Sequence, residues 1–179
     1  MGIITTVMKQ RLTNWDQKFF TSIFRLNGRT IIANIARIIS HSGNGYLYPI
    51  MGLLGYLASS EVGMTFVLSG LMAYSVELPI YYLVKNTVKR NRPYDVLKGI
   101  TNLVVPIDKF SFPSGHTAGA TVAAVLVWYF FPALGLLTAV WAGTVAFARI
   151  CVGVHYPTDI IAGALLGGMS SMASIWIVG

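Results

Sequence analysis

The chain has 179 residues, of which 55% are hydrophobic and 11% charged, and its 13 Lys and Arg against 6 Asp and Glu give a net charge of +7. Soluble domains carry about 25% charged residues, and a protein of this size has too much surface relative to its volume to bury so much apolar side chain. The composition therefore excludes an ordinary soluble domain, a disordered chain and a polar, basic nucleic-acid-binding protein, and it predicts a membrane protein.

Residues 1–45 are predicted to form amphipathic helices that lie on the membrane rather than cross it. Apolar side chains such as Trp15, Phe19 and Phe20 recur there at helical spacing, with charged residues between them. That pattern is typical of a helix in the membrane interface. Residues 31–39 are apolar but few, and they include an arginine, so we interpret them as a second interfacial helix or a lead-in to the membrane.

Residues 46–179 are predicted to form the transmembrane core. They contain five apolar stretches, at residues 46–59, 64–84, 117–131, 133–147 and 160–178. A helix needs about 20 residues to cross a bilayer, and very short links make the stretches they join antiparallel neighbours. We expect an all-α integral membrane bundle of five to six transmembrane helices, with the sixth crossing present if residues 31–39 also span.

Two polar segments, residues 85–113 and 149–159, interrupt the apolar core. The second apolar stretch ends at the first polar segment, and the third begins there and crosses to the opposite face. The fourth crosses back and ends at the second polar segment. Both segments are therefore predicted to meet on the same membrane face. An excess of Lys and Arg in a membrane protein reflects either its topology or a site for an anionic headgroup or substrate.

Three pieces of these segments carry charged or reactive side chains. Lys85 and Arg92 are seven residues apart, about two helical turns, so both can point to one side. Ser114 has the position of an N-cap at the start of an apolar stretch, where free backbone N–H groups attract anions. His155 and Asp159 are four residues apart near a helix start, where a carboxylate can hold the imidazole in one tautomer.

Together the pieces offer what phosphoryl transfer without a metal requires: charge stabilisation, an activated nucleophile and an acid for the leaving group. Lys85, Arg92 and Arg149 supply fixed positive charge, and Ser114 and the Gly115 amide supply neutral hydrogen-bond donors. The nucleophile and the proton donor are the two histidines, His116 and His155. The sequence has no carboxylate cluster or histidine set spaced to hold Mg²⁺ or Zn²⁺, so we expect no metal and no cofactor.

These pieces resemble the three signature motifs of the type-2 phosphatidic acid phosphatase family, which shares its core with vanadium haloperoxidases. The family pattern K-x6-R-P, P-S-G-H and S-R-x5-H-x3-D corresponds to residues 85–93, 113–116 and 148–159. The resemblance implies that His155 attacks phosphorus to form a phosphohistidine, that Asp159 orients it, and that His116 protonates the leaving oxygen. It also implies that the phosphate is held by Lys85, Arg92, Ser114, Gly115 and Arg149.

One position departs from the family pattern, because Ala148 stands where a serine usually donates to the phosphate. A neutral hydrogen bond contributes about 0.5–1.5 kcal/mol, so its loss predicts weaker phosphate binding rather than an inactive site. Cys151 lies within the same motif at a position that the pattern leaves free, and we interpret it as a packing residue.

Several charged residues outside the pattern are interpreted separately. Four cations are assigned to topology, as anchors that flank a span: Lys89, Arg90, Lys98 and Lys109. His41 is interpreted as a polar residue at a helix end. Glu77 lies inside an apolar stretch, where an ionisable side chain is costly and often functional. A structural partner in the bundle and a role near the site fit it equally, but Lys85, about 12 Å away along a helix, is not its direct partner.

The sequence therefore predicts a metal-independent lipid phosphatase of the bacterial inner membrane. Its expected partners are the bilayer and a phospholipid or polyprenyl phosphate, such as undecaprenyl diphosphate, phosphatidylglycerol phosphate, phosphatidic acid or a lipid A phosphate. A phosphotransferase that uses the same histidine and a non-catalytic binder or transporter of anionic lipids are the alternatives. The resemblance implies a site on the extracytoplasmic face, whereas the N-terminal cations favour the cytoplasmic face if residues 31–39 do not span.

Overall fold

The computed structural model describes residues 2–28, 30–59 and 61–179, and within them the chain forms helices and loops without a strand. The helices in chain order are α1 (Gly2–Phe24), the 3-10 helix η1 (Arg25–Gly28), α2 (Thr30–Ser42), α3 (Leu47–Ala58), α4 (Gly63–Val88), α5 (Pro93–Val96), α6 (Gly115–Phe130), α7 (Pro132–Cys151) and α8 (Pro157–Val178). The predicted all-α fold is confirmed, and the five predicted apolar stretches correspond to α3, α4, α6, α7 and α8.

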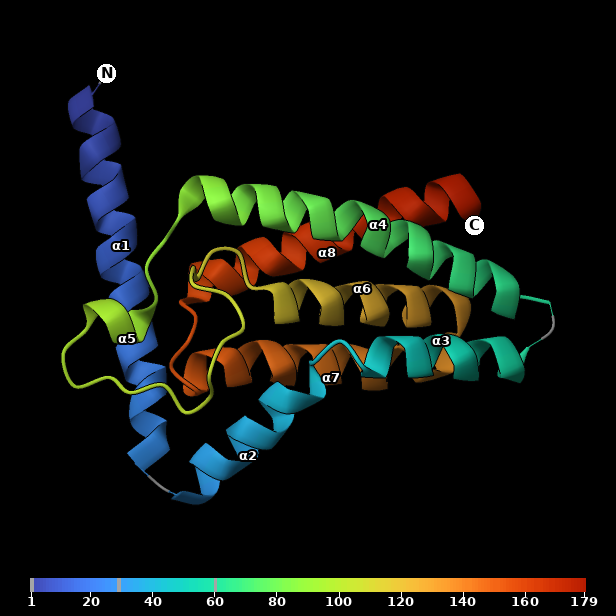
Figure 1. Ribbon diagram of the computed structural model, residues 1–179, viewed down its shortest axis with the longest axis horizontal. Coiled ribbons are helices and arrows are strands. Elements are labelled where there is room, and N and C mark those ends of the chain that lie inside the picture. Colours follow the sequence, from blue (N-terminus) through green and yellow to red (C-terminus); the bar gives the residue numbers. More distant parts are fainter. Residues whose placement is uncertain (1, 29, 60) are drawn as a thin grey trace.

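The helix α6 lies at the centre of the bundle, where it contacts α4, α7 and α8 (Figure 1). Most of its residues are buried, and many of them are Ala or Gly. Small side chains let neighbouring helices approach closely, which is how helices associate in lipid. The N-terminus of α6, where Gly115 and His116 lie, is thereby fixed at the polar end of the bundle.

Three segments are long and apolar enough to cross a membrane, namely Gly63–Val96, Pro132–Cys151 and Pro157–Val178. The helices α3 and α6 are shorter, with 12 and 16 residues, and α6 is enclosed by its neighbours. Large apolar side chains on the outer faces of α7 and α8 are exposed, among them Leu136 and Leu165. A bilayer covers such faces, whereas a soluble monomer rarely exposes apolar patches of this extent. The chain is therefore an integral membrane protein, as predicted.

The N-terminal helix α1 lies across the polar end of the bundle, and α2 runs from there back to α3 (Figure 1). Phe20 of α1 is fully buried and packs edge-on against Tyr156, with 5.6 Å between ring centroids. An orientation across the spanning helices suits a helix in the membrane interface. The same orientation brings α1 into contact with both α7 and α8.

Close packing of α8 on α6 depends on two glycines, Gly163 and Gly167. A Cβ atom at Gly167 would overlap the carbonyl oxygen of Ala118, and one at Gly163 would overlap that of Ser114. Both obstacles are backbone atoms, so no side-chain rotation can relieve them. Gly168, the next residue on α8, faces open space instead.

We expect Gly167→Ala to lower the free energy of unfolding by about 1–3 kcal/mol, because α8 must move away from α6. The matched control is Gly168→Ala, which brings the same gain in helix propensity without an overlap. Thermal unfolding in detergent measures both variants. A Gly167→Ala protein as stable as the Gly168→Ala protein would show that the two helices do not pack as closely as described.

Candidate active site

The two polar segments meet at one end of the bundle, as the helix directions predict. The backbone N–H of Ser114 donates to the carbonyl of Asp159 at 3.0 Å, and that of Leu103 donates to Val152 at 2.9 Å. Arg92 Nη1 donates to the carbonyl of Val154 at 2.8 Å. Residues from the three motifs are thus joined directly to one another.

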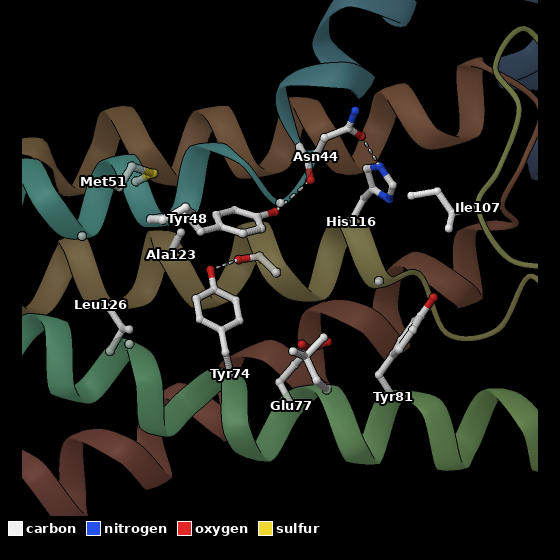
Figure 2. A pocket seen from close by; sticks show the side chains of 18 of the residues that line it. Asn44, Tyr48, Met51, Tyr74, Glu77, Tyr81, Ile107, His116, Ala123 and Leu126 are labelled. Carbon is white, nitrogen blue, oxygen red and sulfur yellow. Dashed lines mark hydrogen bonds between the residues drawn. The ribbon is translucent and has the colours of Figure 1, made fainter.

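A cavity of about 690 Å³ begins at this meeting point and extends between α3, α4 and α6 (Figure 2). Its polar end is lined by Arg92, Gly115, His116, Arg149 and His155. The rest is largely apolar, with side chains such as Met51, Phe66 and Leu126. Three of the predicted site residues, Lys85, Ser114 and Asp159, are buried directly behind the polar end.

The carboxylate of Asp108 holds two of the predicted phosphate-binding cations. Its Oδ1 atom lies 2.8 Å from Lys85 Nζ and 2.6 Å from Arg92 Nη2, and its Oδ2 atom accepts a hydrogen bond from the Tyr81 hydroxyl at 2.5 Å. Burial alone would raise the pKa of Asp108, but the hydrogen bonds from Lys85 and Tyr81 and the nearby positive charges bring it below its ordinary value. Asp108 is therefore ionised and compensates part of the positive charge.

Arg149, in contrast, has no carboxylate within ion-pair distance among the described residues. Its side chain is 4% exposed, Nη1 donates to Ser40 Oγ at 2.6 Å, and Nε has no hydrogen-bond partner. The Nε atom of Arg92 is also unpaired. Buried charges without a partner are costly, so these donors at the end of a cavity fit an anionic ligand.

His155 lies against the same cations. Its Nε2 atom is 3.5 Å from Arg92 Nη1, and its Nδ1 atom is 3.6 Å from Asp159 Oδ2 and makes no hydrogen bond. Burial, and then the charges of Arg149, Arg92 and Lys85, hold the pKa of His155 well below its ordinary value. The imidazole is therefore neutral, and a neutral imidazole has a free lone pair for nucleophilic attack.

Asp159 is held by Arg90, which corrects the sequence interpretation of Arg90 as a topology anchor. Arg90 Nη1 lies 2.7 Å from Asp159 Oδ1, and Nη2 lies 2.5 Å from Oδ2 of Asp16 on α1. The other oxygen of Asp159 accepts the N–H of Tyr156 at 2.8 Å. The guanidinium also lies 4.1 Å from the centroid of the Tyr156 ring, so Arg90 joins α1 to the start of α8.

Ser114 and His116 are positioned at the start of α6. Ser114 is the N-cap, as predicted, because its hydroxyl accepts the N–H of Thr117 at 3.4 Å. Its Oγ atom also accepts from the Thr117 hydroxyl at 3.0 Å. His116 Nε2 donates to Oδ1 of Asn44 at 2.8 Å (Figure 2). The neighbouring Gly115 packs against the ring of Tyr81, which a Cβ atom at that position would meet at 2.8 Å.

Sequence reasoning missed six residues that position the predicted site, five of them by direct contact and Asp16 through Arg90. They are Asp16, Ser40, Asn44, Tyr81, Arg90 and Asp108. One signal was available, because the chain contains only 6 Asp and Glu. In so apolar a protein each carboxylate is expensive unless it is paired or functional, and that argument would have drawn attention to Asp16 and Asp108.

Comparison with known proteins gives consistent matches. The model of the PAP2 superfamily matches residues 50–179. The decaprenylphosphoryl-5-phosphoribose phosphatase of Mycobacterium tuberculosis is 38% identical over 134 residues, which cover 74% of this chain and 72% of that protein. The undecaprenyl-diphosphatase of Sulfolobus acidocaldarius is 30% identical over 173 residues, or 93% and 75% of the two chains. The crystal structure of Aquifex aeolicus LpxE superimposes with a TM-score of 0.77 at 25% identity and covers 89% of this chain and 93% of that one.

Proposed function

Because this chain belongs to the PAP2 superfamily, we propose that it hydrolyses the phosphomonoester or diphosphate of a membrane lipid through a phosphohistidine formed on His155. It is a membrane phosphatase, in line with the names of its relatives. The observation that carries the mechanism is that a neutral His155 and Arg149, which is buried without a counter-ion among the described residues, both line the polar end of an apolar cavity. The cations bind the phosphoryl group, and the cavity receives the lipid that carries it.

In the proposed reaction, His155 Nε2 attacks phosphorus, and a nitrogen–phosphorus bond forms as the phosphorus–oxygen bond to the lipid breaks. Arg92, Arg149 and the Gly115 N–H stabilise the charge on the phosphoryl oxygens. His116 gives its Nδ1 proton to the leaving oxygen. Because its Nε2–H is already donated to Asn44, this is the second proton of an imidazolium, which the negative charge of the bound phosphate stabilises. Water then attacks the phosphohistidine, His116 accepts the water proton, and inorganic phosphate leaves.

Asp159 and Lys85 act from behind the reacting atoms in this proposal. Asp159 faces His155 Nδ1 at 3.6 Å, and catalytic hydrogen bonds of this kind are often long before substrate binds. When the nucleophile becomes positively charged, the carboxylate stabilises that charge. Lys85 adds positive charge next to Arg92 through their shared partner Asp108.

Phosphate release by the purified protein in detergent tests the proposal against a panel of lipid phosphates and diphosphates. We expect excess EDTA to leave the rate unchanged, because the proposed chemistry uses protein cations alone. A second, unphosphorylated lipid in the same assay separates hydrolysis from transfer, since a phosphotransferase would form a new lipid phosphate in place of free phosphate. Loss of all release in EDTA would overturn the metal-independent mechanism.

We also propose that the site opens on the extracytoplasmic face of a bacterial inner membrane, as the family resemblance implies. Since α1 lies at the site end of the bundle, the cations of α1 share that face, and the positive-inside rule alone would place it in the cytoplasm. Site cations are present for chemistry and distort such a balance. In the same assay, intact cells should hydrolyse an externally added short-chain lipid phosphate, and activity only after cell disruption would reverse the assignment.

A further inference from the structure

A buried carboxylate, that of Glu77, lies in the cavity beyond the catalytic end. Glu77 of α4 is 2% exposed and lines the cavity. Among the described residues, no group donates a hydrogen bond to its side chain and no cation lies within ion-pair distance of it. The tyrosine hydroxyls of this part of the cavity are already used, because Tyr74 donates to the carbonyl of Gly119 and Tyr48 to that of Gly43, each at 3.0 Å.

The position of Glu77 is fixed by its neighbours on α4. Tyr81, one helical turn closer to the catalytic end, packs against Gly115, and Tyr74, one turn farther away, reaches Gly119. Glu77 lies between these two levels, and Figure 2 shows it between Tyr74 and Tyr81, with His116 on the opposite side of the cavity. A substrate whose leaving oxygen meets His116 therefore extends its alcohol into the part of the cavity that Glu77 lines.

The chemistry of this position selects one kind of group. A hydrocarbon would leave the carboxylate buried and unpaired, which is costly. A second phosphate would be repelled by it at short range. An ammonium group would suit Glu77 but would enter a cavity whose catalytic end already carries the positive charges of Arg92 and Arg149. A hydroxyl group carries no charge and donates the missing hydrogen bond.

We propose that Glu77 is a specificity-determining residue that accepts a hydrogen bond from a hydroxyl group of the alcohol that carries the phosphate. The preferred substrate would then have a sugar or polyol between the phosphate and the hydrocarbon, rather than a phosphate or diphosphate attached directly to the chain. This inference rests on the proposed function, because it describes the leaving group of that reaction.

Two lipids that differ in one hydroxyl test the inference. Lysophosphatidic acid has a free hydroxyl on the carbon next to the one that carries the phosphate, and its 2-deoxy analogue has the same charge and tail without that hydroxyl. Because hydrogen bonds to charged groups are strong, the wild-type protein should have a kcat/KM about tenfold or more higher for lysophosphatidic acid. Glu77→Leu should bring this ratio close to one and leave the rate on the analogue within a few-fold.

Two further variants make the result specific. Glu77→Gln is nearly isosteric and keeps an acceptor oxygen without the charge, so its ratio should lie between those of the wild-type and Glu77→Leu proteins. Glu61→Gln removes an exposed carboxylate outside the cavity and should leave the ratio unchanged. A wild-type ratio near one, or a ratio that persists in Glu77→Leu, would overturn the inference while phosphate release upholds the proposed function. Failure to release phosphate from any lipid would overturn both.

Discussion

His155→Ala is expected to lower phosphate release by about 10⁴-fold or more, since removal of an enzyme's nucleophile has effects of this size. In the wild-type site the imidazole is neutral and lies 3.5 Å from Arg92, so it is prepared to attack a phosphoryl group bound by that cation. Alanine leaves the cations in place, and phosphate binding should therefore persist. Initial rates in detergent and binding of inorganic phosphate measure the two effects separately.

A labelled substrate gives a second measurement on the same variant. Wild-type protein quenched during turnover should carry an acid-labile phosphoryl group, and His155→Ala should carry none. His41 provides the matched control, because it is exposed at the end of α2 and does not line the cavity. Its Nδ1 atom lies 3.3 Å from the amide nitrogen of Asn44, and glutamine keeps an acceptor for that amide. His41→Gln should keep both the rate and the label. Phosphate release by a folded His155→Ala protein at the wild-type rate would rule out the phosphohistidine.

Arg90→Ala is expected to lower the free energy of unfolding by about 3–5 kcal/mol, the usual effect of removing one partner of a buried ion pair. Arg90 lies between Asp159 and Asp16, which are 0% and 1% exposed. Without the guanidinium, two buried carboxylates would lose their counter-ion. Phosphate release should fall as well, because Asp159 would no longer be held beside His155.

Lys98 is the control for the loss of a cation on the same face, since it is exposed and lies in the same polar segment. Surface substitutions of this kind usually change stability by no more than about 0.5 kcal/mol. Thermal unfolding in detergent compares Arg90→Ala with Lys98→Ala. Equal midpoints for the two variants would mean that Arg90 is only a topology anchor, as the sequence interpretation had it.

The convergence of the two polar segments could be predicted because helix directions follow from the order of apolar stretches and short links. The contacts of Arg90 could not, since a cation next to a span satisfies a topology rule equally well. Asp108 lies in the irregular segment between α5 and α6, and no periodicity fixes the path of such a segment. Its pairing with Lys85 and Arg92 depends on where the loop folds back.

Glu77 also shows what the sequence can and cannot predict about a single side chain. Its place in an apolar stretch identified an unusual carboxylate, and its spacing excluded Lys85 as a direct partner. Both statements agree with the structure, in which Lys85 pairs with Asp108. The direction of the Glu77 side chain, however, depends on how α4 packs against α6, and a single helix with apolar residues all around does not encode that.

The contacts made by α1, α2 and the turn after α2 have a consequence for how far the catalytic unit extends. The superfamily match begins at residue 50, yet Arg90, Arg149 and His116 are held by Asp16, Ser40 and Asn44. The boundary of the superfamily match and the boundary of the candidate site therefore do not coincide. Two proteins with the same three motifs but different N-terminal segments would hold those motifs with different partners. Sequence divergence before residue 50 can therefore change the positions of the site residues while the three motifs stay the same.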